Sequence, residues 1–150
     1  MNSKNKKFSL AIDGSTNILS IAILDKIKIV KVKHYKNFNQ IHEIDNYFTN
    51  ITDFFNHEFE IDTIYVGCGP GSFSGLRKSI SFAQAYKFSN IHRSEQDFFS
   101  IGINSLACLA YGFKQNNPSS DSKFLLSLID TGCNDYYGQL YSTENNKYNL

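Results

Sequence analysis

The stretch FSLAIDGSTNILSIAILDKIKIVKVKHY, residues 8–35, decides the fold class. Three β-rich runs follow one another in it, at residues 8–13, 18–25 and 27–35. Short polar connections separate the runs, so the sequence predicts a three-stranded antiparallel meander. The third run mixes lysines with valines and isoleucines, which predicts a strand with one solvated face, toward the edge of a sheet.

Helical spacing replaces the strand pattern after residue 39. Apolar residues recur every three or four positions, at Ile41, Ile44, Phe48, Ile51, Phe55 and Phe59, which predicts an amphipathic helix. The pattern then predicts, in order, a buried strand at 61–67, a helix at 74–88, a short strand at 99–103 and a helix at 105–113. The order βββαβαβα indicates an α/β fold of the ribonuclease-H-like kind, a mixed sheet flanked by helices.

A polar segment divides the chain. Residues 114–123 include Asn116-Asn117-Pro118-Ser119-Ser120 and form the best linker, between a first lobe at 1–113 and a partial second lobe at 124–150. Residues 124–130 and 136–142 predict a hairpin in that second part. Its segment ending at Asp130 echoes the one ending at Asp13, since each is an apolar strand that ends in Asp. Internal duplication and chance between two short strands both explain the echo.

Composition narrows the function classes. The chain has 150 residues and a net charge of +1 with only two arginines, which argues against a stand-alone nucleic-acid binder. Its three cysteines are an odd number without a C-x-x-C pair, as expected for reduced thiols in the cytoplasm. The apolar run near the start stops at Asp13, and no run is long enough to span a bilayer, so we expect neither a signal peptide nor a membrane partner.

The first candidate site is the turn Asp13-Gly14-Ser15-Thr16 between two predicted strands. An acid and backbone N–H groups at such a turn can hold a metal and a phosphate, as in nucleotide-binding loops. The alternative is a hairpin with ordinary turn residues.

The second candidate is the glycine-rich stretch from Gly67 to Arg77, GCGPGSFSGLR. A glycine-rich turn before a helix suits phosphate, although this one matches neither common phosphate-loop pattern and its proline removes one N–H donor. The alternative is a strand-to-helix turn capped by Ser72 or Ser74. Cys68 lies in this stretch without an identifiable base, so a small structural residue is the simpler interpretation.

Small residues recur along the following helix, at Gly75, Ser79 and Ala83, with Leu76 and Ile80 beside them. Such a stripe lets a second helix approach closely, either from a partner or, alternatively, from the chain's own sheet. The histidines His34, His42, His57 and His92 show no metal-binding spacing.

Taken in order, four segments resemble the TsaB (YeaZ) family. They are AIDGST at 11–16, GPGSFSGLR at 69–77, IGINSL at 101–106, and Ile129-Asp130. The second segment is the specific one, with Gly69, Pro70, Gly71, Ser72, Phe73, Ser74 and Arg77 as its marker residues. Gly14, Cys68 and the pair Lys78-Ser79 depart from the family pattern, and the family's second lobe continues well beyond a hairpin.

The resemblance implies two ribonuclease-H-type lobes of the actin-like ATPase and sugar kinase superfamily, the second truncated here. It also implies a non-catalytic subunit that supports a TsaD-like partner in making threonylcarbamoyladenosine in tRNA. ATP and metal would then be held by the partner, whose H-x-x-x-H motif is absent here, and this chain alone would bind no cofactor. A TsaE-like ATPase is a further expected partner, tRNA contact would be indirect, and the isolated chain would pair as a homodimer.

On this basis the expected helical contact comprises Gly75, Leu76, Ser79, Ile80 and Ala83, and the remnant phosphate loop comprises Asp13, Ser15 and Thr16. The main alternative is a nucleotide phosphohydrolase or phosphotransferase that uses Asp13 with a metal. A peptidase is a third possibility, which lacks a nucleophile and base pair.

Overall fold

The structure is a computed structural model and describes residues 6–36, 44–55, 59–90 and 98–142. Its elements are β1 (Lys7–Asp13), β2 (Leu19–Asp25), β3 (Lys28–Tyr35), α1 (Ile44–Phe55), β4 (Glu60–Gly69), α2 (Phe73–Asn90), β5 (Phe99–Asn104), α3 (Ser105–Asn116), β6 (Phe124–Asp130) and β7 (Tyr136–Ser142). This order confirms the predicted meander and the α/β alternation after it. The predicted positions Ile41, His42, His57 and His92 lie outside the described residues.

The main sheet has five strands in the order β3-β2-β1-β4-β5. β1, β2 and β3 pair antiparallel, whereas β4 runs parallel to both β1 and β5. The sheet is therefore mixed, and β3 lies at its edge, as its lysines predicted. Because β1, β4 and β5 are parallel, the carboxyl ends of these three strands meet at one end of the sheet.

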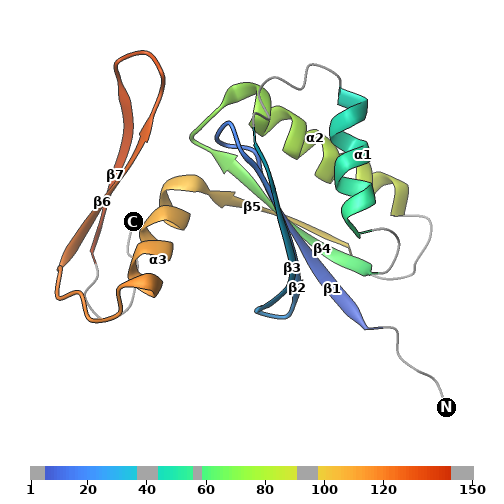
Figure 1. Cartoon of the computed structure of the whole chain (residues 1–150), viewed down its shortest axis with the longest axis horizontal. Coiled ribbons are helices and arrows are strands. Elements are labelled where there is room, and N and C mark those ends of the chain that lie inside the picture. Colours follow the sequence, from blue (N-terminus) through green and yellow to red (C-terminus); the bar gives the residue numbers. More distant parts are fainter. Residues whose placement is uncertain (1–5, 37–43, 56–58, 91–97, 143–150) are drawn as a thin grey trace.

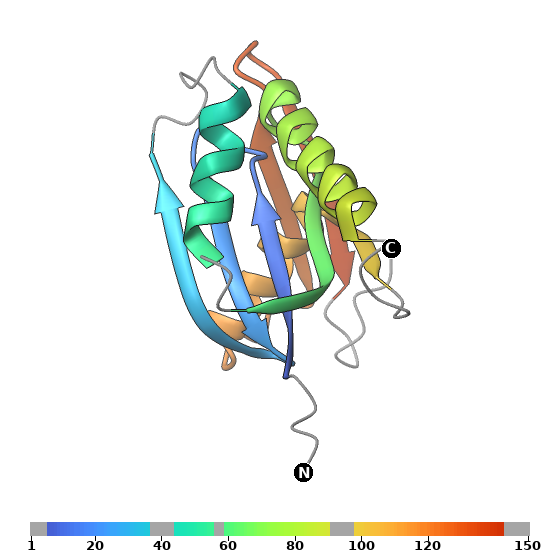
Figure 2. The same cartoon turned by 90° about the vertical axis from the view of Figure 1, so that its right-hand side faces the viewer.

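Helices lie on both faces of this sheet (Figures 1 and 2). α1 and α2 cover one face, where the main core forms from alternate residues of the strands. The buried side chains of this core are Leu10, Ile12, Leu19, Ile21, Ile23, Ile51, Phe54, Ile61, Ile64, Val66, Phe82 and Ala83. Both helices therefore use their apolar faces against the chain's own strands.

The opposite face is covered by α3, with the β6–β7 hairpin beyond it (Figure 1). Leu106 and Ala110, one helical turn apart, pack against Tyr141 of β7 in a second buried cluster. Asn104 caps α3, because its side chain accepts a 3.0 Å hydrogen bond from the backbone N–H of Ala107. α3 ends at Asn116, so the first residues of the predicted linker at 114–123 are helical. None of the described helices is long and apolar enough to cross a membrane.

Candidate functional site

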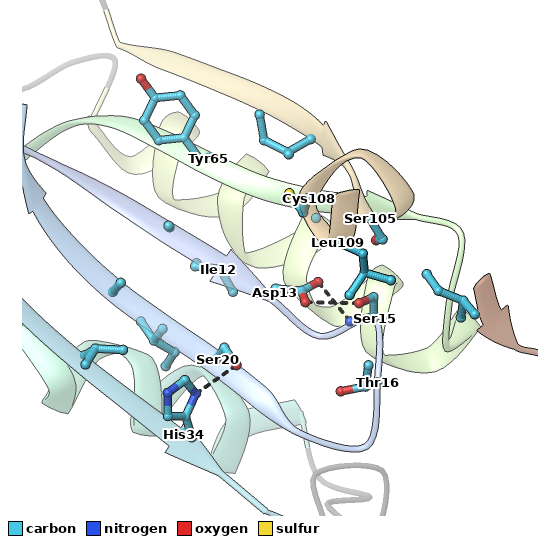
Figure 3. Close-up of a pocket in the computed structure, with 17 residues that line it drawn as sticks. Ile12, Asp13, Ser15, Thr16, Ser20, His34, Tyr65, Ser105, Cys108 and Leu109 are labelled. Carbon is cyan, nitrogen blue, oxygen red and sulfur yellow. Dashed lines mark hydrogen bonds between the residues drawn. The ribbon is translucent and has the colours of Figure 1, made fainter. Parts of the chain in front are cut away.

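The Asp13 loop connects β1 to β2 and is held in place by its own carboxylate. The backbone N–H of Ser15 donates to Asp13 Oδ1 at 3.1 Å, and the hydroxyl of Ser15 donates to Oδ2 at 3.0 Å (Figure 3). Thr16 bonds with Ile18 instead, accepting from its backbone N–H at 3.1 Å. The predicted loop residues therefore lie together, with Ser15 buried and Thr16 exposed.

The glycine-rich segment packs directly on this loop. The backbone N–H of Ser72 donates to the carbonyl of Ser15 at 2.6 Å. Gly71 has a φ of 155°, and a Cβ there would lie 2.4 Å from the same carbonyl oxygen. In α2, a Cβ on Gly75 would lie 1.9 Å from the carbonyl oxygen of Gly14. These glycines are therefore required for the close approach of two loops.

Ser72 precedes the first residue of α2, as the sequence predicted for a capping serine. Its hydroxyl accepts a long hydrogen bond of 3.4 Å from the backbone N–H of Gly75. Arg77 lies over the ring of Phe73, with its guanidinium carbon 5.3 Å from the ring centre. Phe73 itself is 75% exposed, so this pair lies on the outer surface of α2.

The small-residue stripe of α2 faces inward, not toward solvent. Ser79 and Ala83 are fully buried, and Gly75 contacts the Asp13 loop. The expectation that this stripe is open to a partner is therefore wrong, because the small residues are needed for α2 to approach β1 and its loop. Of the five residues assigned to the contact, Ile80 is exposed and Leu76 is half-buried.

A cleft of about 450 Å³ lies on the sheet face opposite α1 and α2. Its floor consists of two adjacent rows of cross-strand neighbours. One row is apolar and comprises Tyr65, Ala11, Ala22 and Val32 on β4, β1, β2 and β3. The other contains Gly67, Asp13, Ser20 and His34. Ser20 and His34 are joined by a 2.9 Å hydrogen bond between the hydroxyl and Nδ1 (Figure 3).

α3 and the hairpin supply the walls of the cleft. Ser105, Cys108 and Leu109 face it from α3, and Ile129 faces it from β6. Burial, the Asp13 carboxylate and Cys68 together raise the pKa of the Cys108 thiol.

Asp13 has a counterpart in the hairpin. The backbone N–H of Gly132 donates to Asp130 Oδ1 at 2.7 Å, which repeats the bond of Ser15 to Asp13 at the end of another first hairpin strand. Asp130 is exposed and does not line the cleft. The two segments that are similar in sequence therefore also share a hydrogen bond from the backbone N–H two residues on to the Asp carboxylate.

Among the described residues, no three His, Cys, Asp or Glu side chains gather where they could hold a metal ion. Within the described lining of the cleft, Asp13 is the one carboxylate, and lysine and arginine do not occur. The sequence identified Asp13, Ser15 and Thr16 here but missed Ser20, His34, Tyr65 and Cys108. Ser20, His34 and Tyr65 share one signal, alternation on neighbouring strands, which becomes visible only when the strands are set in register. Cys108 lies on α3 and does not share it.

Comparison with known proteins identifies a family whose members the chain resembles. The model of the family described as "TsaD: tRNA N6-adenosine threonylcarbamoyltransferase" matches residues 29–148. No curated protein sequence matches the chain.

Two solved structures are similar in fold. YeaZ from Pseudomonas aeruginosa has a TM-score of 0.73 and 21% identity, over 96% of this chain and 64% of that one. A structure described as an uncharacterized protein with similarity to peptidase YEAZ from Pseudomonas aeruginosa has a TM-score of 0.69 and 21% identity, over 93% of this chain and 61% of that one. The chain thus spans less than two thirds of the length of either. The family match and the likeness to YeaZ confirm the resemblance that the sequence motifs indicated. They also confirm the expected actin-like fold.

Proposed function

Because the chain belongs to the TsaD family, we propose that it serves tRNA modification as a non-catalytic subunit, supporting a TsaD-type partner that forms N6-threonylcarbamoyladenosine. The residues that line the cleft are the observation that supports an accessory, non-catalytic role. Phosphoryl transfer is catalysed by cations and metal ligands arranged around the phosphates. The described lining offers one carboxylate, already bonded twice to Ser15, and no basic side chain except that of His34. ATP and a metal are therefore assigned to the partner in this proposal.

The outer surface of α2 is the proposed contact with that partner. Phe73, Ile80 and Phe88 are 75%, 37% and 72% exposed and recur at helical spacing, with Arg77 and Gln84 between them. Exposed aromatic side chains in a row are typical of surfaces that bind another protein. Ile80 keeps its predicted role, while the buried members of the predicted set instead hold α2 in position.

The proposal also covers the remaining partners. A TsaE-like ATPase would join the same assembly, tRNA would be held mainly by the partner, and the isolated chain would pair with itself through α2. The three described cysteines are unpaired thiols, which suits a cytoplasmic complex.

Reconstitution tests the proposal. The chain, a TsaD-type partner, tRNA, ATP and a threonylcarbamoyl donor are combined, and the modified nucleoside is measured by mass spectrometry. We expect no product from the chain alone and an increase when it is added to the partner. The variant Phe88→Asp should lose that increase, whereas Phe113→Asp, an exposed change on α3 at the opposite face of the sheet, should retain it. Product from the chain alone, or no effect on the partner, would overturn the proposal.

The alternative of a nucleotide phosphohydrolase or phosphotransferase rests on Asp13, which would act with a metal, and on the adjoining Ser15. We expect negligible hydrolysis of ATP in magnesium and no proteolysis by the isolated chain. ATP turnover that disappears in Asp13→Ala would favour the hydrolase over the accessory subunit.

A further inference from the structure

The polar end of the cleft contains an acceptor, the Asp13 carboxylate, and a donor, the Ser105 hydroxyl. Asp13 is the last residue of β1 and Ser105 directly follows β5, with Gly67 of β4 between them. A Cβ on Gly67 would lie 2.3 Å from Asp13 Oδ1, so the carboxylate leans across β4 in the direction of β5 and α3. The absent side chain at Gly67 makes room for the carboxylate itself, which could not take this position beside a larger residue.

Ser105 is the unusual residue of this end. It is 7% exposed and lines the cleft, and its Oγ is buried without a hydrogen-bond partner among the residues that the structure describes. Buried hydroxyls are almost always bonded, since leaving one unpaired costs about 1–3 kcal/mol. Ser105 is also the first residue of α3, where backbone N–H groups have no partner within the helix and the helix dipole is positive.

Neither an anion nor a cation suits both Asp13 and the start of α3. An anion would suit the start of α3 but would be repelled by Asp13. A cation would suit Asp13 but would be repelled by the start of α3. It would also leave the N–H and hydroxyl donors at the start of α3 without an acceptor. A neutral group that both donates and accepts satisfies the two sides together.

We propose that the cleft binds a small uncharged molecule that carries a carboxamide or urea group on a compact apolar body. The N–H of that group donates to Asp13, and its carbonyl oxygen accepts from Ser105 after rotation of the hydroxyl toward the cleft. The apolar body lies on the row formed by Ala11, Ala22 and Val32. A cleft of about 450 Å³ has the size of small-molecule sites, which are mostly apolar with a few polar groups. This inference is independent of the accessory role.

Three probes with one aromatic ring test the proposal on the full chain. Benzamide donates and accepts, benzylamine is a cation that only donates, and benzoate is an anion that only accepts. Titrations followed by NMR give the three dissociation constants and the residues that shift. We expect benzamide to bind at least about fivefold tighter than either charged probe, as matching one more buried polar group implies. Shifts should map to β1, β2 and the start of α3. Tightest binding of benzylamine or benzoate, or no binding of benzamide at 10-millimolar order, would overturn the proposal.

Matched variants locate the two polar contacts. Asp13→Asn and Ser105→Ala should each weaken benzamide by about fivefold or more. Asp130→Asn repeats the first change at the corresponding turn outside the cleft, and Ser127→Ala repeats the second at another buried serine, so neither should alter binding. Unchanged affinity in both cleft variants would reject the site. If Asp13→Asn does not fold, the order of the three probes and the Ser105→Ala result decide.

Discussion

At the scale of single residues, the glycines of the two loops are required for packing. Gly75 follows the cap of α2 and faces the Gly14 carbonyl, whereas Gly112 lies in α3 with open space where a Cβ would stand. The same substitution therefore has opposite consequences at these two helical positions. Their comparison separates the steric requirement from the general preference of helices for alanine.

We expect Gly75→Ala to destabilise the fold by about 3 kcal/mol, because the added methyl collides with backbone that cannot turn away. Gly112→Ala should instead stabilise it by about 0.5–1 kcal/mol through higher helix propensity and a less flexible unfolded chain. Urea unfolding of both variants measures the difference. Equal effects of the two substitutions would contradict the close approach of α2 to the Asp13 loop.

The thiol of Cys108 reports the charge in the cleft. Burial and then the Asp13 carboxylate raise its pKa, so its thiolate forms at higher pH than that of an ordinary cysteine. Asp13→Asn removes the second cause, and we expect faster alkylation of Cys108 by iodoacetamide at pH 8. Mass spectrometry of the labelled peptide gives the rate, with Asp130→Asn as the control.

The sign for stability follows from the same shift. The folded chain holds the Cys108 proton more tightly than the unfolded chain does, so this contribution is present at neutral pH and is lost as the pH rises above the ordinary thiol pKa. An identical alkylation profile in Asp13→Asn and the natural chain would show that the carboxylate does not act on the thiol.

At the scale of elements, α2 has a buried side and an open side that differ within two residues. Ala83 is fully buried against the sheet, whereas Ala85 is exposed. We expect Ala83→Arg to destabilise the fold by about 4 kcal/mol or more, since it forces an unpaired charge into a packed core. Ala85→Arg should change stability by less than about 0.5 kcal/mol.

Thermal unfolding of the two arginine variants measures this contrast directly. A stable Ala83→Arg variant would mean that the stripe of small residues faces solvent. The predicted contact of this stripe with a partner would then be supported.

The elements themselves could largely be predicted from local sequence. The runs of β-forming residues placed β6 and β7 at their observed bounds and β2 within one residue. The orientation of α2 could not be predicted, because a stripe of small residues fits a partner helix and a sheet equally well. Its contact at Gly14 joins segments far apart in the chain, and no local pattern reports such a contact.

Only part of the cleft could likewise be predicted from local sequence. Asp13 was found because it ends a strand beside a glycine and two hydroxyl residues. The apolar row of Ala11, Ala22 and Val32 was not found, since each residue is unremarkable until the register of three strands brings them together. Ser105 was assigned only to a helix start, because burial of its hydroxyl depends on the surrounding fold.

At the scale of the whole molecule, the two sheets differ in how well they are covered. β4 lies between β1 and β5, and its Ile64 is fully buried. The hairpin is a separate two-stranded sheet that packs on α3 with one face. Its other face leaves five large side chains half or more exposed: Phe124, Leu126, Leu128, Tyr136 and Leu140.

We therefore expect the backbone amides of β6 to exchange with solvent at least about tenfold faster than those of β4, because a two-stranded sheet is marginal without further cover. Native-state hydrogen exchange read by NMR measures both strands in one sample. Equal protection of β6 and β4 would show that α3 alone is sufficient to hold the hairpin.

The lysines of β3 have a consequence for how copies of the protein behave toward one another. β3 is an edge strand with backbone groups open on one side, and its Lys28 and Lys33 side chains are exposed. Two such edges that meet bring like charges together, and this colloidal repulsion reaches about 10 Å at 0.1 M salt but only about 3 Å at 1 M. Concentrated solutions should therefore scatter more light as sodium chloride is raised, and neutralising Lys28 and Lys33 with glutamine should produce the same turbidity at low salt.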